Sequence, residues 1–233
     1  MVAYINHFFF GIYPYVAIFT CIVGCIIRYD REQYSWQASS SQLISNTSLF
    51  RLGNNLFHVG LLLILTGHCV GLLMPESFYI HFISVEKKQL LAMIAGGVFG
   101  IICFIGMTIL VVRRITNKRV RSNSRFSDIL ILLMIYAQLI LGLMTIFISA
   151  QHLNGVSMVA LARWAQHIVT FRSGASDFVM NEHILFKLHI FLGLTIFLIF
   201  PFTRLVHALS FPLHYFTRTG YQIVRARTKK HKL

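Results

Sequence analysis

Residues 52–74 read LGNNLFHVGLLLILTGHCVGLLM, an apolar run that nevertheless contains two histidines, His58 and His68. About 20 apolar residues in a helix cross the hydrocarbon of a bilayer, so this run is long enough to span it. In hydrocarbon each backbone N–H and C=O needs a partner within its own segment, and only the α-helix supplies one. The run therefore predicts a transmembrane helix that carries two imidazoles.

Four other apolar runs have the same character, at residues 5–27, 90–112, 129–150 and 184–209. The whole chain is 56% hydrophobic and 12% charged, with a mean hydropathy of +0.69, which is far from the balance of a soluble domain. We expect an all-α membrane protein with five transmembrane helices. We expect residues 1–233 to form a single domain, with a basic cytoplasmic tail from about residue 210 to residue 233.

The net charge of +14 would suggest nucleic acid in a soluble protein, but here its distribution indicates topology. Residues 28–51, residues 113–127 and the tail from Arg204 hold 3, 6 and 7 of the 21 Lys and Arg residues, against 5 elsewhere. The positive-inside rule places the tail in the cytoplasm and the N-terminus outside. We expect the basic edge, residues 113–125 and 218–232, to meet a partner protein or anionic lipid, with no nucleic acid.

Two smaller patterns complete the layout. Residues 156–171 have apolar side chains at helical spacing around Trp164, which predicts a helix along the outer interface. The four cysteines lie inside apolar runs without a C-x-x-C pair, so we expect buried small side chains, and an iron–sulfur cluster would need another chain.

The last apolar run contains a second pair of histidines, His189 and His207. On continuous helices, His58 and His68 are about 15 Å apart along the axis and roughly 80° apart around it, whereas His189 and His207 are about 27 Å apart on one face. The two runs are expected to cross in opposite directions. This predicts two cross-helix pairs, His58 with His207 near the cytoplasmic side and His68 with His189 near the outer side.

Facing imidazoles on two helices are the donor set of haem with two axial histidines. Tilted helices with a macrocycle between them can absorb the unequal separations. The spans contain no Asp or Glu at membrane depth to accompany the histidines, which argues against a metal-ion transporter. We therefore expect a dihaem b-type cytochrome with two non-covalent haems. The alternative is a haem-free transporter or membrane anchor whose histidines cross-link helices.

The glycines Gly53, Gly60, Gly67 and Gly71 lie within about 20° of one line on the second span. Such a stripe lets another helix approach closely, and Gly67 would also leave room for the edge of a macrocycle or a quinol ring beside His68.

Two residues are candidates for contacts with the bound groups, and a proline lies close to one of them. Arg204, one turn before His207, can pair with a haem propionate or extend to the lipid headgroups. Pro201 would kink the fifth helix. Lys88, close to the outer histidine level, can donate a hydrogen bond to a quinol headgroup, and the alternative is a solvated interfacial charge.

The chain closely resembles the gamma subunit of the membrane-bound respiratory nitrate reductase. The stretches that carry the resemblance are Phe8-Phe9-Phe10-Gly11-Ile12-Tyr13-Pro14-Tyr15, Arg28-Tyr29-Asp30, Asn55-Leu56-Phe57-His58, Gly67-His68, Ser149-Ala150-Gln151-His152, Trp164-Ala165-Gln166, Phe200-Pro201-Phe202-Thr203-Arg204-Leu205-Val206-His207 and Tyr215-Phe216-Thr217-Arg218.

The resemblance implies a five-helix cytochrome b of the bacterial inner membrane with a periplasmic N-terminus. It implies an outer haem b ligated by His68 and His189 and an inner one ligated by His58 and His207. Menaquinol or ubiquinol would be oxidised at the outer haem, and electrons would pass to an iron–sulfur beta subunit and then to a molybdenum-containing alpha subunit. Nitrate reduction itself would use no catalytic residue of this chain. A cytochrome b subunit of a formate dehydrogenase or hydrogenase is the alternative within the same class.

Overall fold

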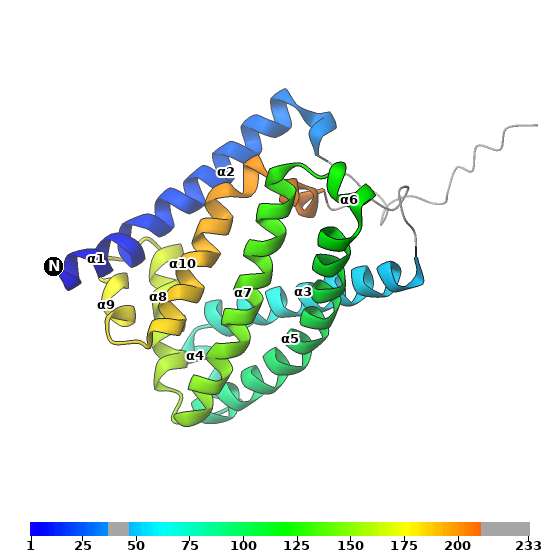
Figure 1. The fold of residues 1–233 in the computed structure, drawn as a ribbon. Helices are drawn as coiled ribbons and strands as arrows, with labels where there is room; N and C mark the ends of the chain where they lie inside the picture. The colour runs from blue at the N-terminus through cyan, green and yellow to red at the C-terminus, as the bar shows by residue number, and fades with distance from the viewer. Residues whose placement is uncertain (37–46, 211–233) are drawn as a thin grey trace, which may run out of the picture.

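The computed structural model describes residues 1–36 and 47–210, and this part of the chain is helical without a strand (Figure 1). The basic tail expected from about residue 210, the segment 218–232 and the motif at residues 215–218 therefore lie outside the described residues, apart from Ser210. The helices are α1 (Val2–His7), α2 (Tyr13–Arg31), α3 (Ser48–Leu73), α4 (Glu76–Tyr79), α5 (Val85–Thr116), α6 (Lys118–Ser122), α7 (Phe126–Gln151), α8 (Val156–Val169), α9 (Ala175–Met180) and α10 (Ile184–Ile199).

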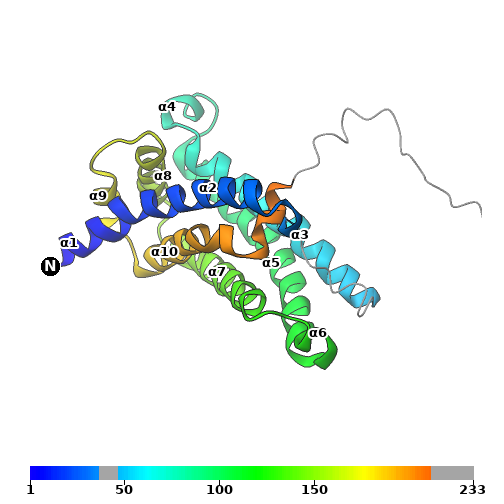
Figure 2. The ribbon, with the colours of Figure 1, turned by 90° about the horizontal axis from the view of Figure 1, so that it is seen from above.

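Five helical segments are long and apolar enough to cross a membrane, which confirms the predicted all-α membrane fold. They are Val2–Arg31, Ser48–Leu73, Val85–Thr116, Phe126–Gln151 and Ile184–Phe202. In the first of them a π-helical turn, Phe8–Ile12, joins α1 to α2. The remaining helices lie at the two ends of the bundle, with α6 at one end and α4, α8 and α9 at the other (Figures 1 and 2).

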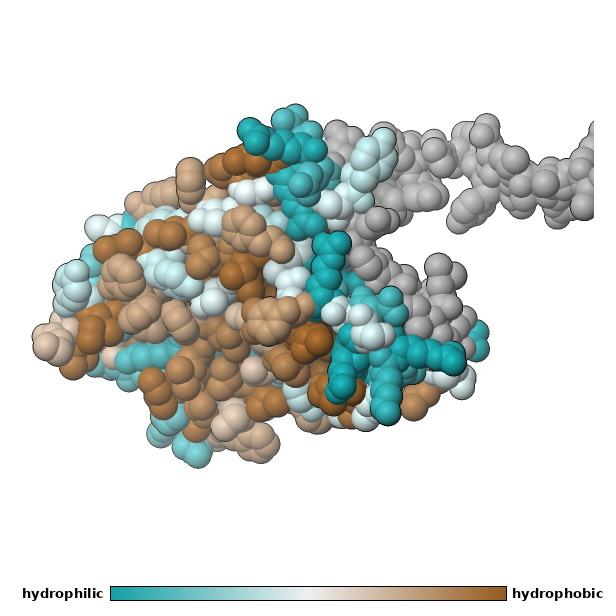
Figure 3. Space-filling view, turned by 45° about the horizontal axis from the view of Figure 1, so that its top comes forward, coloured by the Kyte–Doolittle hydropathy of each residue, from teal (hydrophilic) through white to brown (hydrophobic). Residues whose placement is uncertain are grey.

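The outer surface of the bundle is suited to lipid. Figure 3 shows hydrophobic side chains over most of one face, while hydrophilic side chains gather at the end where α6 lies. In α6 the cations Lys118, Arg119 and Arg121 are exposed. Charged groups outside hydrocarbon keep their hydration, so an apolar belt with a basic end is the arrangement expected of a membrane protein.

The glycine stripe on α3 divides into two halves. A Cβ on Gly53 would lie 2.7 Å from Ile109 Cγ2, and a Cβ on Gly60 would lie 2.7 Å from the backbone nitrogen of Cys103, so both glycines allow close packing against α5. A Cβ on Gly67 or Gly71 would meet nothing within 4 Å. The prediction that a helix approaches along the stripe is therefore right for the first half and wrong for the second.

The fifth span changes direction at Pro201, as predicted, but it does not continue to residue 209 as an α-helix. The α-helix ends at Ile199, a 3₁₀ turn covers Phe200–Phe202, and a second 3₁₀ segment covers Arg204–Leu209. Between them Thr203 is extended, at φ −117° and ψ 177°. Pro201 causes the break because it has no N–H and its ring clashes with the carbonyl four residues earlier. The expected rise of about 27 Å and the shared face of His189 and His207 are thus wrong.

The predicted helix around Trp164 is present as α8, and it is packed into the bundle on one face. The Trp164 side chain is buried and its Nε1 donates to the carbonyl of Phe10 at 2.9 Å. Gly155, at φ 74°, begins the helix in a left-handed conformation that glycine adopts at little cost. The ring joins α8 to the first span in a core that also contains Ala17 and Leu194.

All four cysteines are free, and they differ in burial. Cys25 and Cys103 are buried and Cys21 is partly buried, but Cys69 is exposed, contrary to the expectation.

Replacing Gly60 by Ala should lower the free energy of unfolding by about 1–3 kcal/mol, because the added methyl would overlap the α5 backbone. Gly71→Ala is the matched control, since its methyl enters open space and alanine favours the helix by about 0.5–1 kcal/mol. Thermal unfolding of the detergent-solubilised protein, followed by circular dichroism, measures both. Equal midpoints for the two variants would contradict the packing described above.

Candidate functional site

His68 of α3 and His189 of α10 face each other across two spans that run in opposite directions (Figure 1). Their ring centroids are 6.1 Å apart and the ring planes differ by 35°. An imidazole–metal bond is about 2.0 Å and the ring centre lies about 1.1 Å behind the nitrogen, so two imidazoles on one metal have centroids about 6.2 Å apart. The structure brings this expected pair together at a separation that fits a single iron.

Three of the four histidines are held in the same way, through Nδ1. That nitrogen donates to the carbonyl four residues earlier in His58 (Asn54, 2.7 Å) and in His68 (Ile64, 2.8 Å). In His207 it donates to the carbonyl of Arg204. Because a carbonyl only accepts, the proton is on Nδ1 and the lone pair is on Nε2. This tautomer is the one that a metal-ligating imidazole uses.

His189 is held differently, by α7. Gln138 Nε2 donates to the backbone carbonyl of His189 at 3.0 Å. The same nitrogen lies 3.4 Å from Nε2 of the His189 ring. A Cβ on Gly142 would lie 3.0 Å from the Cε1 of His189, so the ring needs a glycine at this point. The Nδ1 of His189 is buried with no hydrogen-bond partner in the described part of the chain. An orphan imidazole nitrogen suits a ligand to a metal.

Sequence reasoning missed both Gln138 and Gly142. The available signal was their spacing, because residues four apart share one face of a helix and a glutamine is rare in an apolar span. Its interpretation needed the knowledge that α7 is the neighbour of His189, which spacing alone does not give.

The two histidines of the expected inner pair, His58 and His207, do not face each other in contact as His68 and His189 do. His58 lies in the first half of α3 and His207 on the 3₁₀ segment after the break, at the end of the bundle that contains α6 (Figures 1 and 2). Their rings are not in contact. Residues 1–36 and 47–210 hold no group of three or more His, Cys, Asp or Glu suited to a metal, so pairs of histidines are the donor sets to consider.

Arg204 points into the protein. Its Nε lies 3.6 Å from Oδ1 of Asp128 in the first turn of α7, and both side chains are mostly buried. The alternative in which Arg204 extends to the lipid headgroups is therefore wrong. The ion pair attaches the segment that carries His207 to α7.

Lys88 is 8% exposed, so the alternative of a solvated interfacial charge is also wrong. Its ammonium lies 3.6 Å above the centre of the Tyr79 ring, and its Nζ has no hydrogen-bond partner among the described residues. The ring face attracts the cation and replaces part of its lost hydration. Tyr79 comes from α4, and burial, followed by the nearby charge of Glu76, raises the pKa of its hydroxyl.

The residue after Lys88 joins this end of α5 to the connection between α7 and α8. Gln89 Nε2 donates to the carbonyls of Ser149 and His152 at 3.0 and 2.9 Å, and Gln89 Oε1 accepts from the backbone N–H of Gly155 at 2.8 Å. Three bonds from one buried amide hold the start of α5, and Lys88 with it, in a fixed place.

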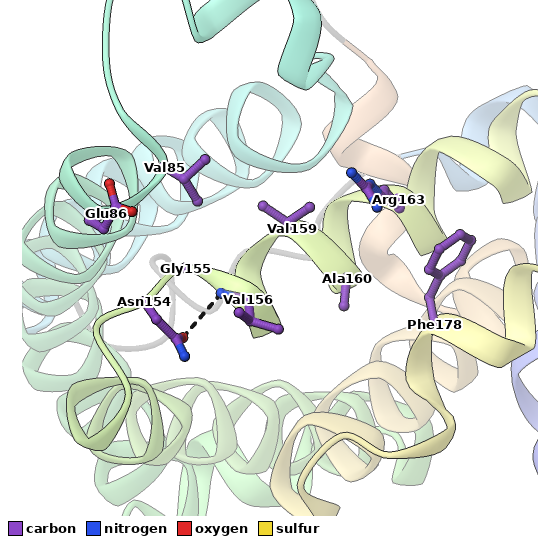
Figure 4. A pocket seen from close by; sticks show the side chains of 9 residues that line it. All are labelled: Val85, Glu86, Asn154, Gly155, Val156, Val159, Ala160, Arg163 and Phe178. Atoms are coloured by element: carbon purple, nitrogen blue, oxygen red, sulfur yellow. Dashed lines mark hydrogen bonds between the residues drawn. The ribbon is translucent and has the colours of Figure 1, made fainter.

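A cavity of about 330 Å³ lies beside this region (Figure 4). It is bounded by the start of α5, the turn before α8, α8 itself and Phe178 of α9, and its lining is mainly apolar apart from Glu86, Asn154 and Arg163. It contains none of the four histidines, so it is distinct from the imidazole pair.

The nitrate reductase gamma subunit family matches residues 6–227 of the chain. The chain belongs to this family. It is 48% identical to the respiratory nitrate reductase 2 gamma chain of Escherichia coli K12 over 97% of this chain and 100% of that protein. It is 38% identical to the nitrate reductase gamma chain of Bacillus subtilis 168 over 94% of this chain and 97% of that protein.

A more distant relative is the Hdr-like menaquinol oxidoreductase cytochrome b-like subunit of Archaeoglobus profundus, 31% identical over 65% of this chain and 44% of that protein. As a gamma subunit, the chain is a membrane-anchoring part of respiratory nitrate reductase, a multi-subunit oxidoreductase. Family membership favours nitrate reductase over the formate dehydrogenase or hydrogenase alternative.

The two neighbouring lysines of α5 should differ in reactivity. An amine-acylating reagent that enters detergent micelles should modify Lys87, which is exposed, at least about tenfold faster than Lys88, whose burial against Tyr79 blocks attack. Peptide mass spectrometry after partial labelling measures the ratio. Tyr79→Leu, which removes the ring under the ammonium, should narrow the difference, and equal labelling in the unmodified protein would contradict the structure.

Proposed function

We propose that this gamma subunit oxidises quinol near the outer, periplasmic face of the bacterial inner membrane and delivers the electrons to the cytoplasmic side through two b haems. The observation that carries the proposal is the opposition of His68 and His189, 6.1 Å apart on different spans. Menaquinol or ubiquinol is the substrate, and the similarity to the Archaeoglobus relative, named as a subunit of a menaquinol oxidoreductase, supports this class.

Four imidazoles would hold the haems, His68 with His189 at the outer level and His58 with His207 at the inner level. The bonds from Nδ1 to backbone carbonyls keep the Nε2 lone pairs of His58, His68 and His207 ready for iron. When bound, each haem supplies a one-electron carrier whose potential depends on its ligands and surroundings. Arg204, already anchored by Asp128, is the candidate partner for a propionate of the inner haem.

Lys88 is the candidate donor to the quinol headgroup. Its buried ammonium, oriented over Tyr79, donates to a quinol oxygen and stabilises the anion that forms when the first hydroxyl proton leaves. The open space around Gly67, one residue before His68, admits the ring beside the outer histidine pair. The protons leave on the outer side, where the loop between α3 and α5 meets water.

Electrons that move inward while protons leave outward separate charge across the membrane. This stores about 2.3 kcal/mol per charge at 100 mV, which accounts for a quinol site and a nitrate site on opposite sides. The acceptor is the iron–sulfur beta subunit, which passes the electrons to molybdenum in the alpha subunit for anaerobic nitrate respiration. The exposed cations of α6 are suited to that partner or to anionic lipid.

Replacing each histidine in turn should remove one haem. In reduced-minus-oxidised spectra of membranes, His68→Ala or His189→Ala should abolish the outer haem signal, and His58→Ala or His207→Ala the inner one, because each iron loses an axial nitrogen. His81→Ala, an exposed histidine between α4 and α5, is the control and should keep both. No Soret band in the unmodified protein, despite haem supply, would favour a haem-free transporter or anchor.

Replacing Lys88 by Ala should lower kcat/KM for quinol about tenfold to a hundredfold, the effect of losing one charged hydrogen bond, while both haem signals stay. The assay follows quinol-dependent nitrate reduction by the assembled complex, and a dye that reduces the partner subunits directly should give an unchanged rate. Lys87→Ala is the matched control. Wild-type kinetics in Lys88→Ala would remove Lys88 from the quinol site.

A further inference from the structure

The break in the fifth span interrupts the helical hydrogen-bond ladder. Pro201 has no N–H to donate to the carbonyl four residues earlier, and Thr203 is extended and serves as the N-cap of the second 3₁₀ segment. Both residues are buried. In a membrane-embedded bundle an unsatisfied carbonyl costs several kcal/mol, so the break needs a donor from another part of the chain.

That donor is Arg28, in the last turn of α2. Its Nη1 donates to the carbonyls of Pro201 at 2.6 Å and Thr203 at 2.7 Å. Its Nε and Nη2 donate to the hydroxyl and carbonyl of Ser35 at 3.0 and 3.1 Å. All three guanidinium nitrogens are therefore engaged with the protein. The side chain joins three segments at the point where the fifth span breaks.

A second residue of α2 fits the same break. Gly24 lies one turn before Arg28, and a Cβ on it would lie 2.7 Å from Cγ of Pro201. The proline ring thus rests directly on the α2 backbone while the guanidinium holds the carbonyls beside it. Two independent contacts place the break against one face of α2.

The break in turn determines where His207 lies. Thr203 Oγ1 accepts from the backbone N–H of Leu205 at 3.2 Å and so starts the 3₁₀ segment. Val206 is 0% exposed and anchors that segment in the core. The Nδ1 of His207 donates to the carbonyl of Arg204 within the same segment. A displacement at Thr203 would therefore move the imidazole.

We infer that Arg28 is a positioning residue for His207, which it holds in place as an axial ligand of the inner haem through the carbonyls of Pro201 and Thr203. The inference rests on the proposed haem-ligand role of His207. Arg28 itself touches neither haem nor quinol in this role, since its nitrogens are committed to backbone and to Ser35. Its effect is confined to the inner level, because His68 and His189 are held by α3 and α7.

The test compares Arg28→Ala with Arg31→Ala in membranes that contain the assembled complex, from cells grown with limiting haem. Arg31 is exposed in the same last turn, so its replacement removes an equal charge without touching the break. Arg28→Ala should lower the ratio of inner to outer haem about tenfold, from the loss of two charge-assisted hydrogen bonds, and shift the low-spin electron paramagnetic resonance signal of the inner haem that remains. Arg31→Ala should change neither.

Arg28→Lys is the conservative variant. Its ammonium carries three N–H groups and can serve both carbonyls, so it should restore the inner haem although the bonds to Ser35 are lost. If Arg28→Ala fails to accumulate, Gly24→Ala displaces Pro201 from the other side and should also lower the inner haem selectively.

The outcomes distinguish a failure of the proposed function from a failure of the positioning role of Arg28. A wild-type complex without two b haems refutes the proposed function. Two haems in wild type with an unchanged inner haem in Arg28→Ala refute the positioning role alone. An equal loss of both haems in Gly24→Ala or Arg28→Lys also refutes it, because the effect would then be a general loss of structure.

Discussion

A carbonyl oxygen in hydrocarbon has no water to accept from, and most of this structure follows from that constraint. It makes the five apolar runs helical, and because an imidazole N–H in hydrocarbon likewise needs a partner, Nδ1 of three histidines donates to a carbonyl on their own segment. Where Pro201 interrupts the ladder, the carbonyls of Pro201 and Thr203 accept from Arg28 of a different span. The same requirement thus sets local structure, the tautomer of the histidines and a contact between distant segments.

Buried polar atoms that remain without a hydrogen bond are therefore informative. In the described part of the chain they include His189 Nδ1, Gln138 Oε1 and Lys88 Nζ. All three belong to residues at or beside the proposed outer haem and quinol level. An unpaired buried polar group is costly, and the protein retains these three where a cofactor and a substrate would supply partners.

The spans and their number could be predicted because length and hydropathy are local properties of the sequence. The packing of Gly53 and Gly60 on α5 was also predictable from spacing, but the open surface at Gly67 and Gly71 was not, since nothing local tells which neighbour stops short. The proline predicted a kink. The contact of the break with Arg28 was not predictable in the same way, because Arg28 is 173 residues away from Pro201 in sequence.

The burial of Lys88 is a second feature that local sequence does not predict. A lysine at the start of a span usually reaches water, and its stem is long enough to do so. Here α4 folds back after Pro75 and lays the Tyr79 ring under the ammonium, while Gln89 fixes the backbone next to it. The sequence identified the residue, but its environment comes from segments that only the folded chain assembles.

The separation of the two outer histidines depends on helices that carry no ligand. α3 is seated on α5 through Gly53 and Gly60, and α10 is held by α7 through Gln138 and Gly142. α5 and α7 in turn meet closely at Gly100, where a Cβ would lie 2.6 Å from Leu143 Cδ2. The His68–His189 distance therefore depends on three helix contacts, α3 with α5, α5 with α7 and α7 with α10, each of which includes a glycine. An added methyl at Gly60 would overlap the α5 backbone and one at Gly142 would crowd the His189 ring, so small side chains on α3 and α7 help to set the separation of the two imidazoles.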